Sequence, residues 1–451
     1  MSELKPQGLK KSQVLLYGFF GMFLNTFYLM FLAYNRLFYL TNVLKLSTGV
    51  SAVVNTLSVW GNVVTMLLAG AIIEKFSFKS GKFRTWAAIG GLVVGVAFTM
   101  LFADFHLSQG AAGALFVVLF VVQSIGYNTL WVAERSLVGP MSVSAADANS
   151  LAMVAQQGST LGGLIYGVIN PYIMKAVGSS YTWTALIYGL LIVIGTLGMF
   201  ALTKQYDTGA APAPKAQKQQ KEKGGFLKAM TGPTIPFFFA MILNNMHLGF
   251  FMTLLAYFTQ YVLNDPVVLS TAVTAGSVAS LIGAWLSKII CDKMGKKRAF
   301  VDFSILTGVL YMLIAFVGRT SVPFLILRVA IGCFSVVGGM LIPVFANDIA
   351  DYNVMKYGTD NRAMIQSISG TTIRFGSALS ATVCSFALVA VGFDATVEIT
   401  PAMINSITYL MAFAPAAVCV LSALIFVFYH IDEKELDAWR AEQAAKKAAA
   451  K

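Results

Sequence analysis

One arginine lies deep inside an apolar segment, where its charge needs a physical reason. Arg374 falls about twelve residues into the segment 363–392, which is about 18 Å along a helix. That depth is close to the middle of a bilayer, where an arginine costs roughly 2.5–3.5 kcal/mol and must face the protein interior or a wet cavity. We expect Arg374 to bind an anionic substrate group, or else to form a structural pair with a neighbouring helix.

A repeated basic motif marks two of the loops between apolar segments. The pattern G-K-x-R occurs at 81–84 and again at 295–298, at matching places in the two halves of the chain. An acidic residue that closes a helix beside such a loop can pair with neighbouring helix ends and release them, as a gate does. The alternative is that both loops only anchor the chain on one side of a membrane.

The composition excludes most soluble classes of protein. Of the 451 residues, 57% are apolar and only 12% are charged, about half the charged fraction of an ordinary soluble domain. The 32 lysines and arginines against 20 acidic residues give a net charge of +12, which in a membrane protein reports cytoplasmic loops rather than nucleic-acid binding. The chain is therefore expected to be an integral membrane protein.

Nothing in the sequence indicates an enzyme. The three histidines are far apart, and the motifs HExxH, GxSxG and GxxxxGK[ST] do not occur. The four cysteines lack CxxC spacing, so neither a metal site nor a disulfide framework is expected. We expect no resident cofactor and no metal, only a coupling ion such as Na⁺ or H⁺.

Apolar runs of about 20 residues predict twelve membrane-spanning helices, arranged six plus six. The predicted spans are 13–40, 47–73, 85–104, 109–134, 149–175, 182–203, 234–262, 267–290, 299–318, 322–349, 363–392 and 403–430. The domains follow as a six-helix bundle over 1–203, a cytoplasmic linker over 204–233, a second bundle over 234–430 and a cytoplasmic tail over 431–451. The linker should carry a short interfacial helix near 226–230, and the tail should be a solvated helix or a frayed end.

The distribution of basic residues predicts the orientation. Most lysines and arginines fall in the loops on the same side as the N-terminus, and few fall on the other side. Both termini should therefore be cytoplasmic, in a multi-pass protein of the plasma (inner) membrane. The expected partners are a small-molecule substrate and the lipid bilayer, without nucleic acid, and we expect a monomer. A second arginine inside a span, Arg328, is expected to be structural.

Several stretches resemble the major facilitator superfamily, and within it the glycoside–pentoside–hexuronide:cation symporter family. In the first half they are Tyr17-Gly18, the run 39–43 and the motif 81–86, which resembles GKFRPW. In the second half, Asp348-x-x-Asp351-Tyr352, Gly358, Arg362 and Arg374-x-Gly376 resemble a family block. The resemblance covers nearly the whole chain and implies an all-α fold of two six-helix bundles that transports a small solute, such as a glycoside or hexuronide-like sugar, by alternating access.

The resemblance also predicts a substrate site, although several of the family's site positions hold a different type of residue in this sequence. Asn25 falls on an acidic sugar-contacting position, Trp131 on an acidic or amide one, and Gln156 on an arginine. Tyr28 and Tyr127 offer stacking faces, although aromatic residues at helical spacing are more often packing. The predicted substrate-binding residues are Asn25, Tyr28, Tyr127, Trp131, Gln156 and Arg374.

The predicted cation site lacks the carboxylates that such a site needs. The family's two acidic positions fall on Asn62 and Met66, neither of which can carry a proton or replace the hydration of Na⁺. Either coupling has moved elsewhere, with Glu134 as the nearest acid, or the protein is an uncoupled facilitator. Glu134 could instead pair with its neighbour Arg135.

The resemblance and the charged loops together give two further expectations. A cytoplasmic gate should involve Lys82, Arg84, Asp348, Asp351 and Arg362. The family residues that this sequence lacks are those of the sugar and cation positions. The alternative function is therefore a divergent facilitator or symporter for an aromatic acid, another organic anion or an amphiphile.

Overall fold

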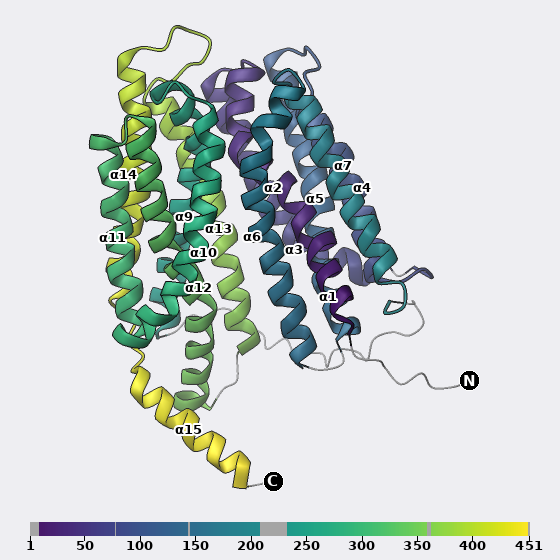
Figure 1. The fold of residues 1–451 in the computed structure, drawn as a ribbon, viewed down its shortest axis with the longest axis vertical. Helices are drawn as coiled ribbons and strands as arrows, with labels where there is room; N and C mark the ends of the chain where they lie inside the picture. The colour runs from purple at the N-terminus through teal and green to yellow at the C-terminus, as the bar shows by residue number, and fades with distance from the viewer. Residues whose placement is uncertain (1–8, 77, 143–144, 208–231, 359–361, 450–451) are drawn as a thin grey trace. The chain divides into compact units, whose positions relative to one another are not determined.

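A computed structural model describes residues 9–76, 78–142, 145–207, 232–358 and 362–449 (Figure 1). Throughout these ranges the regular structure is helical, as the long apolar runs require: inside a bilayer a helix satisfies every backbone hydrogen bond within its own segment. The predicted linker from 208 onward, including its interfacial helix at 226–230, lies outside the described residues.

The first half of the chain forms six long helical runs. The first run is continuous from Lys11 to Val43 and contains two π-helical turns, η1 and η2. The elements are α1 (Lys11–Gly18), η1 (Phe19–Phe23), α2 (Leu24–Phe38), η2 (Tyr39–Val43), α3 (Thr48–Lys75), α4 (Phe83–Leu101), α5 (Gln109–Met141), α6 (Ala145–Ala176) and α7 (Tyr181–Leu202).

The second half repeats this plan and adds a helix at its end. The elements are α9 (Thr234–Tyr257), η3 (Phe258–Val262), α10 (Val267–Met294), α11 (Lys296–Val317), α12 (Ser321–Tyr357), α13 (Arg362–Ala390), α14 (Pro401–Phe426) and α15 (Glu433–Ala449). Each of the twelve predicted spans falls on one of these helical runs. Several helices extend beyond the predicted spans, because α5 and α12 continue past the apolar segment into polar sequence.

Within the described residues, 10 helices are long and apolar enough to cross a membrane. The two predicted spans outside that set are α3 and α6, which are 28 and 32 residues long. Length therefore suits both helices for spanning, and α6 carries polar residues such as Gln156 and Gln157 that lower its hydropathy.

The chain forms two compact units, and they do not follow the predicted boundary between the halves. Unit 1 contains 1–216 together with 255–277 and 381–403, and unit 2 contains 217–254, 278–380 and 404–451. Ends of α9, α10 and α13 thus pack with the first-half helices. The division of the spanning helices into two bundles of six remains a prediction from the sequence.

Close helix packing in unit 1 depends on small residues. The helices α4 and α5 lie side by side, as do α4 and α7 (Figure 1). A Cβ added at Gly90 would lie 2.6 Å from the carbonyl oxygen of Gly126, so only glycine permits this approach of α4 to α5. The tight packing fixes the rotation of α5 and hence the direction of its polar side chains.

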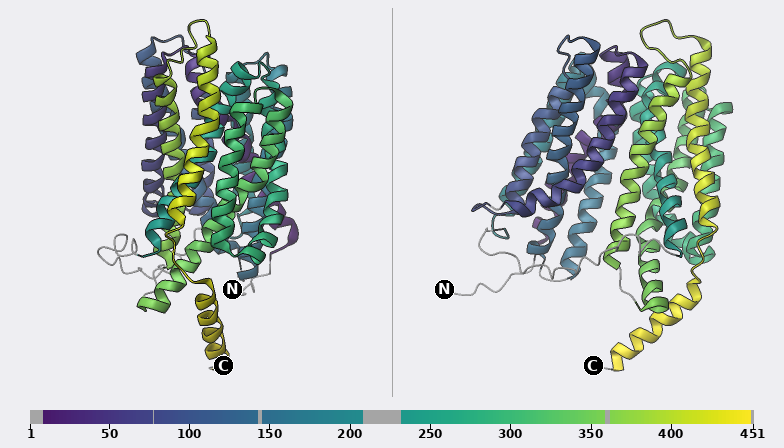
Figure 2. Two further views of the ribbon diagram at one scale, coloured as in Figure 1. Left: turned by 90° about the vertical axis from the view of Figure 1, so that its left-hand side faces the viewer. Right: turned by 180° about the vertical axis from the view of Figure 1, so that it is seen from behind.

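The last helix departs from expectation. The tail was predicted to be a solvated helix or a frayed end, but α15 packs against α12 (Figure 2). Leu436 is 1% exposed and belongs to the main core cluster of unit 2, with Trp439 packed against that cluster. The prediction of a solvated helix is wrong for this part of α15, because two apolar side chains one turn apart bury themselves against the end of α12.

Candidate functional site

A buried carboxylate stands in the middle of unit 1. Glu134 in α5 is 2% exposed, and Asn25 of α2 donates a hydrogen bond from Nδ2 to its Oε1 at 3.4 Å. Tyr17 of α1 donates a hydrogen bond to the backbone carbonyl of Glu134 at 3.0 Å. Gly21 in η1 lies beside this carboxylate, since a Cβ on it would be in ordinary contact with Oε1 at 3.8 Å. The π-helical turn thus brings the first helix against a carboxylate whose hydrogen-bonding neighbours are neutral.

Glu134 does not pair with its neighbour in the sequence. The Arg135 side chain is exposed, and its guanidinium lies 4.2 Å from the centre of the Trp131 ring, one turn earlier on α5. Among the side chains that the structure describes, Glu134 forms no ion pair. The Glu134–Arg135 pair suggested as an alternative from the sequence is therefore wrong, because successive residues point to different faces of a helix.

The predicted cation positions belong to a neutral network. Asn128 of α5 donates from Nδ2 to Asn62 Oδ1 at 2.9 Å and to Thr65 Oγ1 at 2.9 Å. Met66 is half-buried in the same helix, α3. The amide of Asn62 is thus used to join α3 to α5, which is the role of a polar group that connects two helices. Neither Asn62 nor Met66 supplies charge.

The predicted aromatic positions divide into a buried ring and two accessible ones. Tyr28 is 1% exposed and donates its hydroxyl hydrogen bond to Gln123 Oε1. Its ring centre lies 5.5 Å from that of Tyr127, and Tyr127 and Trp131 are both half-buried. Tyr28 is thus buried beside Tyr127, whereas the Tyr127 and Trp131 side chains are partly accessible. Gln123 was missed from the sequence, although a glutamine inside an apolar run was a visible signal.

Two other predicted substrate residues lie on separate elements. Gln156 is exposed on α6 in unit 1. Arg374 is half-buried on α13 in unit 2, about three turns into that helix. No observation tests either assignment, so their substrate roles remain predictions, as do those of Asn25, Tyr28, Tyr127 and Trp131.

The basic half of the predicted gate is bound to an acid that the sequence did not single out. Asp207, just after α7, accepts hydrogen bonds from the backbone N–H of Lys82 at 3.0 Å and of Arg84 at 2.8 Å. The Arg84 guanidinium lies 4.4 Å from the Phe200 ring centre. Asp207 thereby caps the N-terminus of α4 and ties α7 to it. Asp207 falls within the linker predicted from the sequence, and no nearby motif predicted its contact with α4.

The acidic half of the predicted gate is bound within unit 2. Lys296 Nζ lies 2.6 Å from Asp348 Oδ2, and Arg440 of α15 reaches Asp348 Oδ1 at 2.9 Å and Asp351 Oδ2 at 2.5 Å. Burial alone would lower the pKa of Arg440, but its hydrogen bonds to Asp351 and Asp348 outweigh burial and raise the pKa, so the guanidinium keeps its charge. Arg362 begins α13, and its side chain lies outside the described residues.

A network of polar side chains joins helix ends within unit 1. Asn55 of α3 accepts from Arg36 Nε at 2.7 Å and donates to Ser385 Oγ of α13 at 2.7 Å. Two tyrosine hydroxyls extend it, with Tyr257 bonded to Thr41 at 2.7 Å and Tyr261 to Asn42. We call this set the unit 1 seam; its members are Arg36, Thr41, Asn42, Asn55, Tyr257, Tyr261 and Ser385. It fastens η2 and α3 to parts of α9, η3 and α13.

The second arginine inside a predicted span makes an aromatic contact, and its structural role remains a prediction. Arg328 in α12 is 8% exposed, and its guanidinium lies 4.5 Å from the ring centre of Phe251 in α9. This cation–π contact lies within unit 2 and holds α9 to α12.

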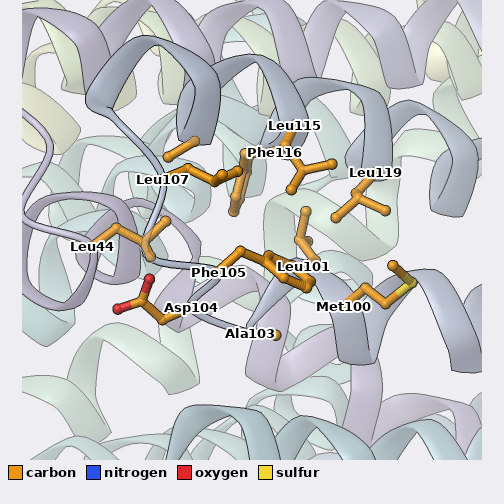
Figure 3. Close-up of a pocket in the computed structure, with 11 residues that line it drawn as sticks. Leu44, Met100, Leu101, Ala103, Asp104, Phe105, Leu107, Leu115, Phe116 and Leu119 are labelled. Atoms are coloured by element: carbon orange, nitrogen blue, oxygen red, sulfur yellow. The ribbon is translucent and has the colours of Figure 1, made fainter.

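Two of the cavities among the described residues of unit 1 differ in size. Figure 3 shows the smaller, which is lined by apolar side chains from Leu44, the end of α4, the following loop and α5, with the Asp104 carboxylate at its edge. Its volume of about 20 Å³ admits roughly one water molecule. The larger cavity, between α2, α6 and α10, has a volume of about 320 Å³. That volume is in the range of small-molecule sites.

Comparison with known proteins identifies the architecture. The model of the family described as MFS/sugar transport protein matches residues 12–433. A proposed 2,3-dihydroxypropane-1-sulfonate exporter of Escherichia coli (strain K12) is 23% identical over 78% of this chain and 78% of that protein. The raffinose carrier protein of Pediococcus pentosaceus is 21% identical over 81% of this chain and 60% of its own length.

Solved structures agree on the fold. The crystal structure of the nucleoside transporter NupG superimposes with a TM-score of 0.64 at 15% sequence identity, covering 94% of this chain and 99% of that one. At this identity the likeness shows the fold alone. The resemblance found from the sequence is confirmed, and so is the expectation of a transporter rather than an enzyme. The chain belongs to the MFS/sugar transport family, as a membrane-embedded secondary transporter of small, sugar-like solutes.

Proposed function

We propose that this protein couples the transport of a hydroxylated organic anion to proton movement, with Glu134 carrying the proton and Arg374 binding the anionic group. The observation that carries the proposal is the environment of Glu134. It is a 2% exposed carboxyl group whose side-chain hydrogen-bond partner is the neutral amide of Asn25.

The charge state of such a group should change with access to water. An ionised carboxylate without an ion-pair partner is very costly inside a membrane protein, so a buried carboxyl group takes up a proton instead. The titratable or charged groups near Glu134 are Tyr17, whose hydroxyl bonds to its carbonyl, and Arg135, which lies over Trp131. When the site opens to water, Glu134 can release the proton. The neutral network around Asn62 cannot do this, which is why coupling is assigned to α5.

The anionic substrate is supported by Arg374 and by one relative. An arginine about three turns into a spanning helix suits a carboxylate or sulfonate, which it binds through two parallel hydrogen bonds. The Escherichia coli relative is a proposed exporter of a hydroxylated sulfonate, whereas the Pediococcus pentosaceus relative carries raffinose. A neutral glycoside is therefore the competing substrate class, and an aromatic acid or amphiphile is the next alternative.

The proposed setting is the inner membrane of a cell, with both termini in the cytoplasm. The abundance of basic residues on the side of the termini supports this orientation. The unit 1 seam then lies at the outer ends of its helices, and it would hold that end closed in the form described. The protein would act as a monomer, as the sequence predicted.

Transport in proteoliposomes separates coupling from binding. With an inward proton gradient, the parent protein should accumulate D-glucuronate, whereas Glu134→Gln should lose accumulation and keep counterflow exchange, because exchange needs no net proton movement. Asn62→Ala, which alters the neutral network, should keep proton-driven accumulation. Accumulation by Glu134→Gln at the parent's rate, or accumulation driven only by a Na⁺ gradient, would refute the assignment.

A second variant tests the anion. Arg374→Met should abolish uptake of D-glucuronate while sparing a neutral glycoside. Equal loss of both would remove Arg374 as the partner of an anionic group and leave it as a structural residue.

A further inference from the structure

The larger cavity of unit 1 lies directly beside a close contact between two helices. At Gly167 in α6, an added Cβ would lie 2.3 Å from Thr274 Oγ1 of α10, so the two helices touch there. Gly163, one turn earlier, faces Ser277 more loosely, since an added Cβ would lie 3.7 Å from its Oγ. On the other side of Gly167 along α6, Pro171 interrupts the backbone bonding of the helix, and residues of both helices line the cavity of about 320 Å³. The cavity thus lies next to a close contact between small residues.

The lining combines one positive charge with amides and hydroxyls. Lys175 supplies the charge, Asn35, Asn170 and Gln260 supply amides, and Tyr181 and Ser270 supply hydroxyls. Asn170 is 7% exposed and held in place by Tyr188, which donates to its Oδ1 at 2.9 Å. This arrangement leaves the Asn170 Nδ2 hydrogens available as donors. Donors around a single cation suit an anion that also carries hydroxyl groups.

Lys175 has no acidic partner among the described residues. It lies in the last turn of α6, where a cation is also favoured by the helix dipole. That role needs only a positive charge near the helix end. It does not require amides from α2, η3 and α6 itself to gather around the same space.

We propose that this cavity is a second binding site, separate from Arg374, for a small hydroxylated anion whose charged group pairs with Lys175. The site goes beyond the proposed function and does not depend on it. Its ligand chemistry has two possible sources: a free hydroxylated acid of the kind transported, or the glycerol phosphate headgroup of phosphatidylglycerol. Both present one negative group and at least one hydroxyl within a few ångströms.

A cysteine-protection experiment tests the site. Ser179 is exposed and lines the cavity, so Ser179→Cys reports whether the cavity is occupied. The reporter is made in full-length protein in which the native cysteines Cys291, Cys333, Cys384 and Cys419 are replaced by serine or alanine. The rate of N-ethylmaleimide labelling is measured in phosphatidylcholine nanodiscs with and without D-glucuronate, and in phosphatidylglycerol nanodiscs without added solute.

The expected result is slower labelling with at least one of the two ligands. Lys175→Gln should weaken that protection about tenfold, while Lys175→Arg should keep it, because a charged hydrogen bond typically contributes this much. Arg319→Gln, which also removes a charge from a loop end, should leave protection unchanged, and so should Arg374→Gln. The last variant separates this site from the proposed transport site.

Each outcome has a definite reading. Protection by D-glucuronate in phosphatidylcholine supports a solute site, and protection in phosphatidylglycerol alone supports a lipid headgroup site. Absence of protection in both membranes would overturn the proposal. Protection that survives in Lys175→Gln would also overturn it, because the anion would then be held elsewhere.

Discussion

Replacing Asn55 by alanine should open the unit 1 seam. Asn55 is fully buried and takes part in three hydrogen bonds: it accepts from Arg36 at 2.7 Å and donates to Ser385 Oγ at 2.7 Å and to the Ala381 carbonyl at 3.3 Å. Alanine removes all three and leaves the Arg36 Nε without this acceptor. The bonds to Ser385 and Ala381 join α3 to α13, so their loss falls directly on the contact between these helices.

The size of the effect follows from the bonds that are lost. A neutral hydrogen bond contributes about 0.5–1.5 kcal/mol net, and one from a charged group about 1.5–3 kcal/mol. The Arg36–Asn55 bond joins α2 to α3 and is lost from the open and closed forms alike, whereas the two bonds that join α3 to α13 are neutral. Their loss should weaken the closed seam by about 1–3 kcal/mol. That energy is roughly a 5- to 150-fold shift in the ratio of open to closed seam.

Cys384 provides a native reporter of this opening. It is 1% exposed and directly precedes Ser385 in α13. With the other three cysteines replaced, a membrane-impermeant maleimide should label Cys384 slowly in the parent and about 5-fold faster or more in Asn55→Ala. The labelling rate tracks the open population when opening is fast relative to the reaction.

Ser58→Ala is the matched control. Ser58 is fully buried in the same helix, but its hydroxyl bonds to the Val54 carbonyl within α3 at 2.7 Å. Its replacement should leave the labelling of Cys384 at the parent's rate. Parent-rate labelling of Asn55→Ala would refute the reasoning that these bonds hold the seam closed. Equal acceleration in both variants would instead indicate general loosening of unit 1.

Three further predictions concern charged contacts. Asp207→Ala should lower the free energy of unfolding by about 1–2 kcal/mol, because the N-terminal cap of α4 is lost. The measurement is the temperature at which buried cysteines become reactive, and Asp207→Asn should lower it less. An unchanged midpoint of that thermal transition in Asp207→Ala would contradict the capping role. Arg440→Gln should weaken the packing of α15 by about 1–3 kcal/mol and speed hydrogen exchange in that helix, because the Arg440 ion pairs are lost while the Asp348–Lys296 pair stays. Asp437→Asn, at an exposed partner of Arg440, is the control and should change little. Unaltered exchange in Arg440→Gln would refute the docking of α15. Arg328→Met should leave thermal stability unchanged or raise it, because it removes a buried charge whose one recorded contact among the described residues is the Phe251 ring. A decrease of more than about 2 kcal/mol in the free energy of unfolding would instead indicate a counter-ion.

The spanning helices could be predicted from the sequence because their cause is local. An apolar run of sufficient length must satisfy its backbone hydrogen bonds within the membrane, and only a helix does so within one segment. The same local reasoning marked the polar residues that need explanation inside those runs, among them Asn62, Glu134 and Arg374. The family could also be recognised, because its motifs are contiguous in the chain.

The partners of those polar residues could not be predicted, because they depend on contacts between distant segments. Glu134 and Asn25 are separated by 109 residues, and Arg440 and Asp348 by 92. A shift of one residue in the rotation of α5 would turn Glu134 away from Asn25, and that rotation is set by packing such as Gly90 against Gly126.

The sequence by itself determined that the chain crosses a membrane as helices, which side is rich in basic residues and which side chains carry charge into the apolar interior. Only the tertiary structure decided what those side chains do. It placed Asn62 in a neutral network, brought Asp207 to the start of α4, docked α15 on α12 and opened a cavity beside Lys175. Hydrophobic length acts within one segment, whereas each of these contacts arises from the close packing of helices far apart in the chain.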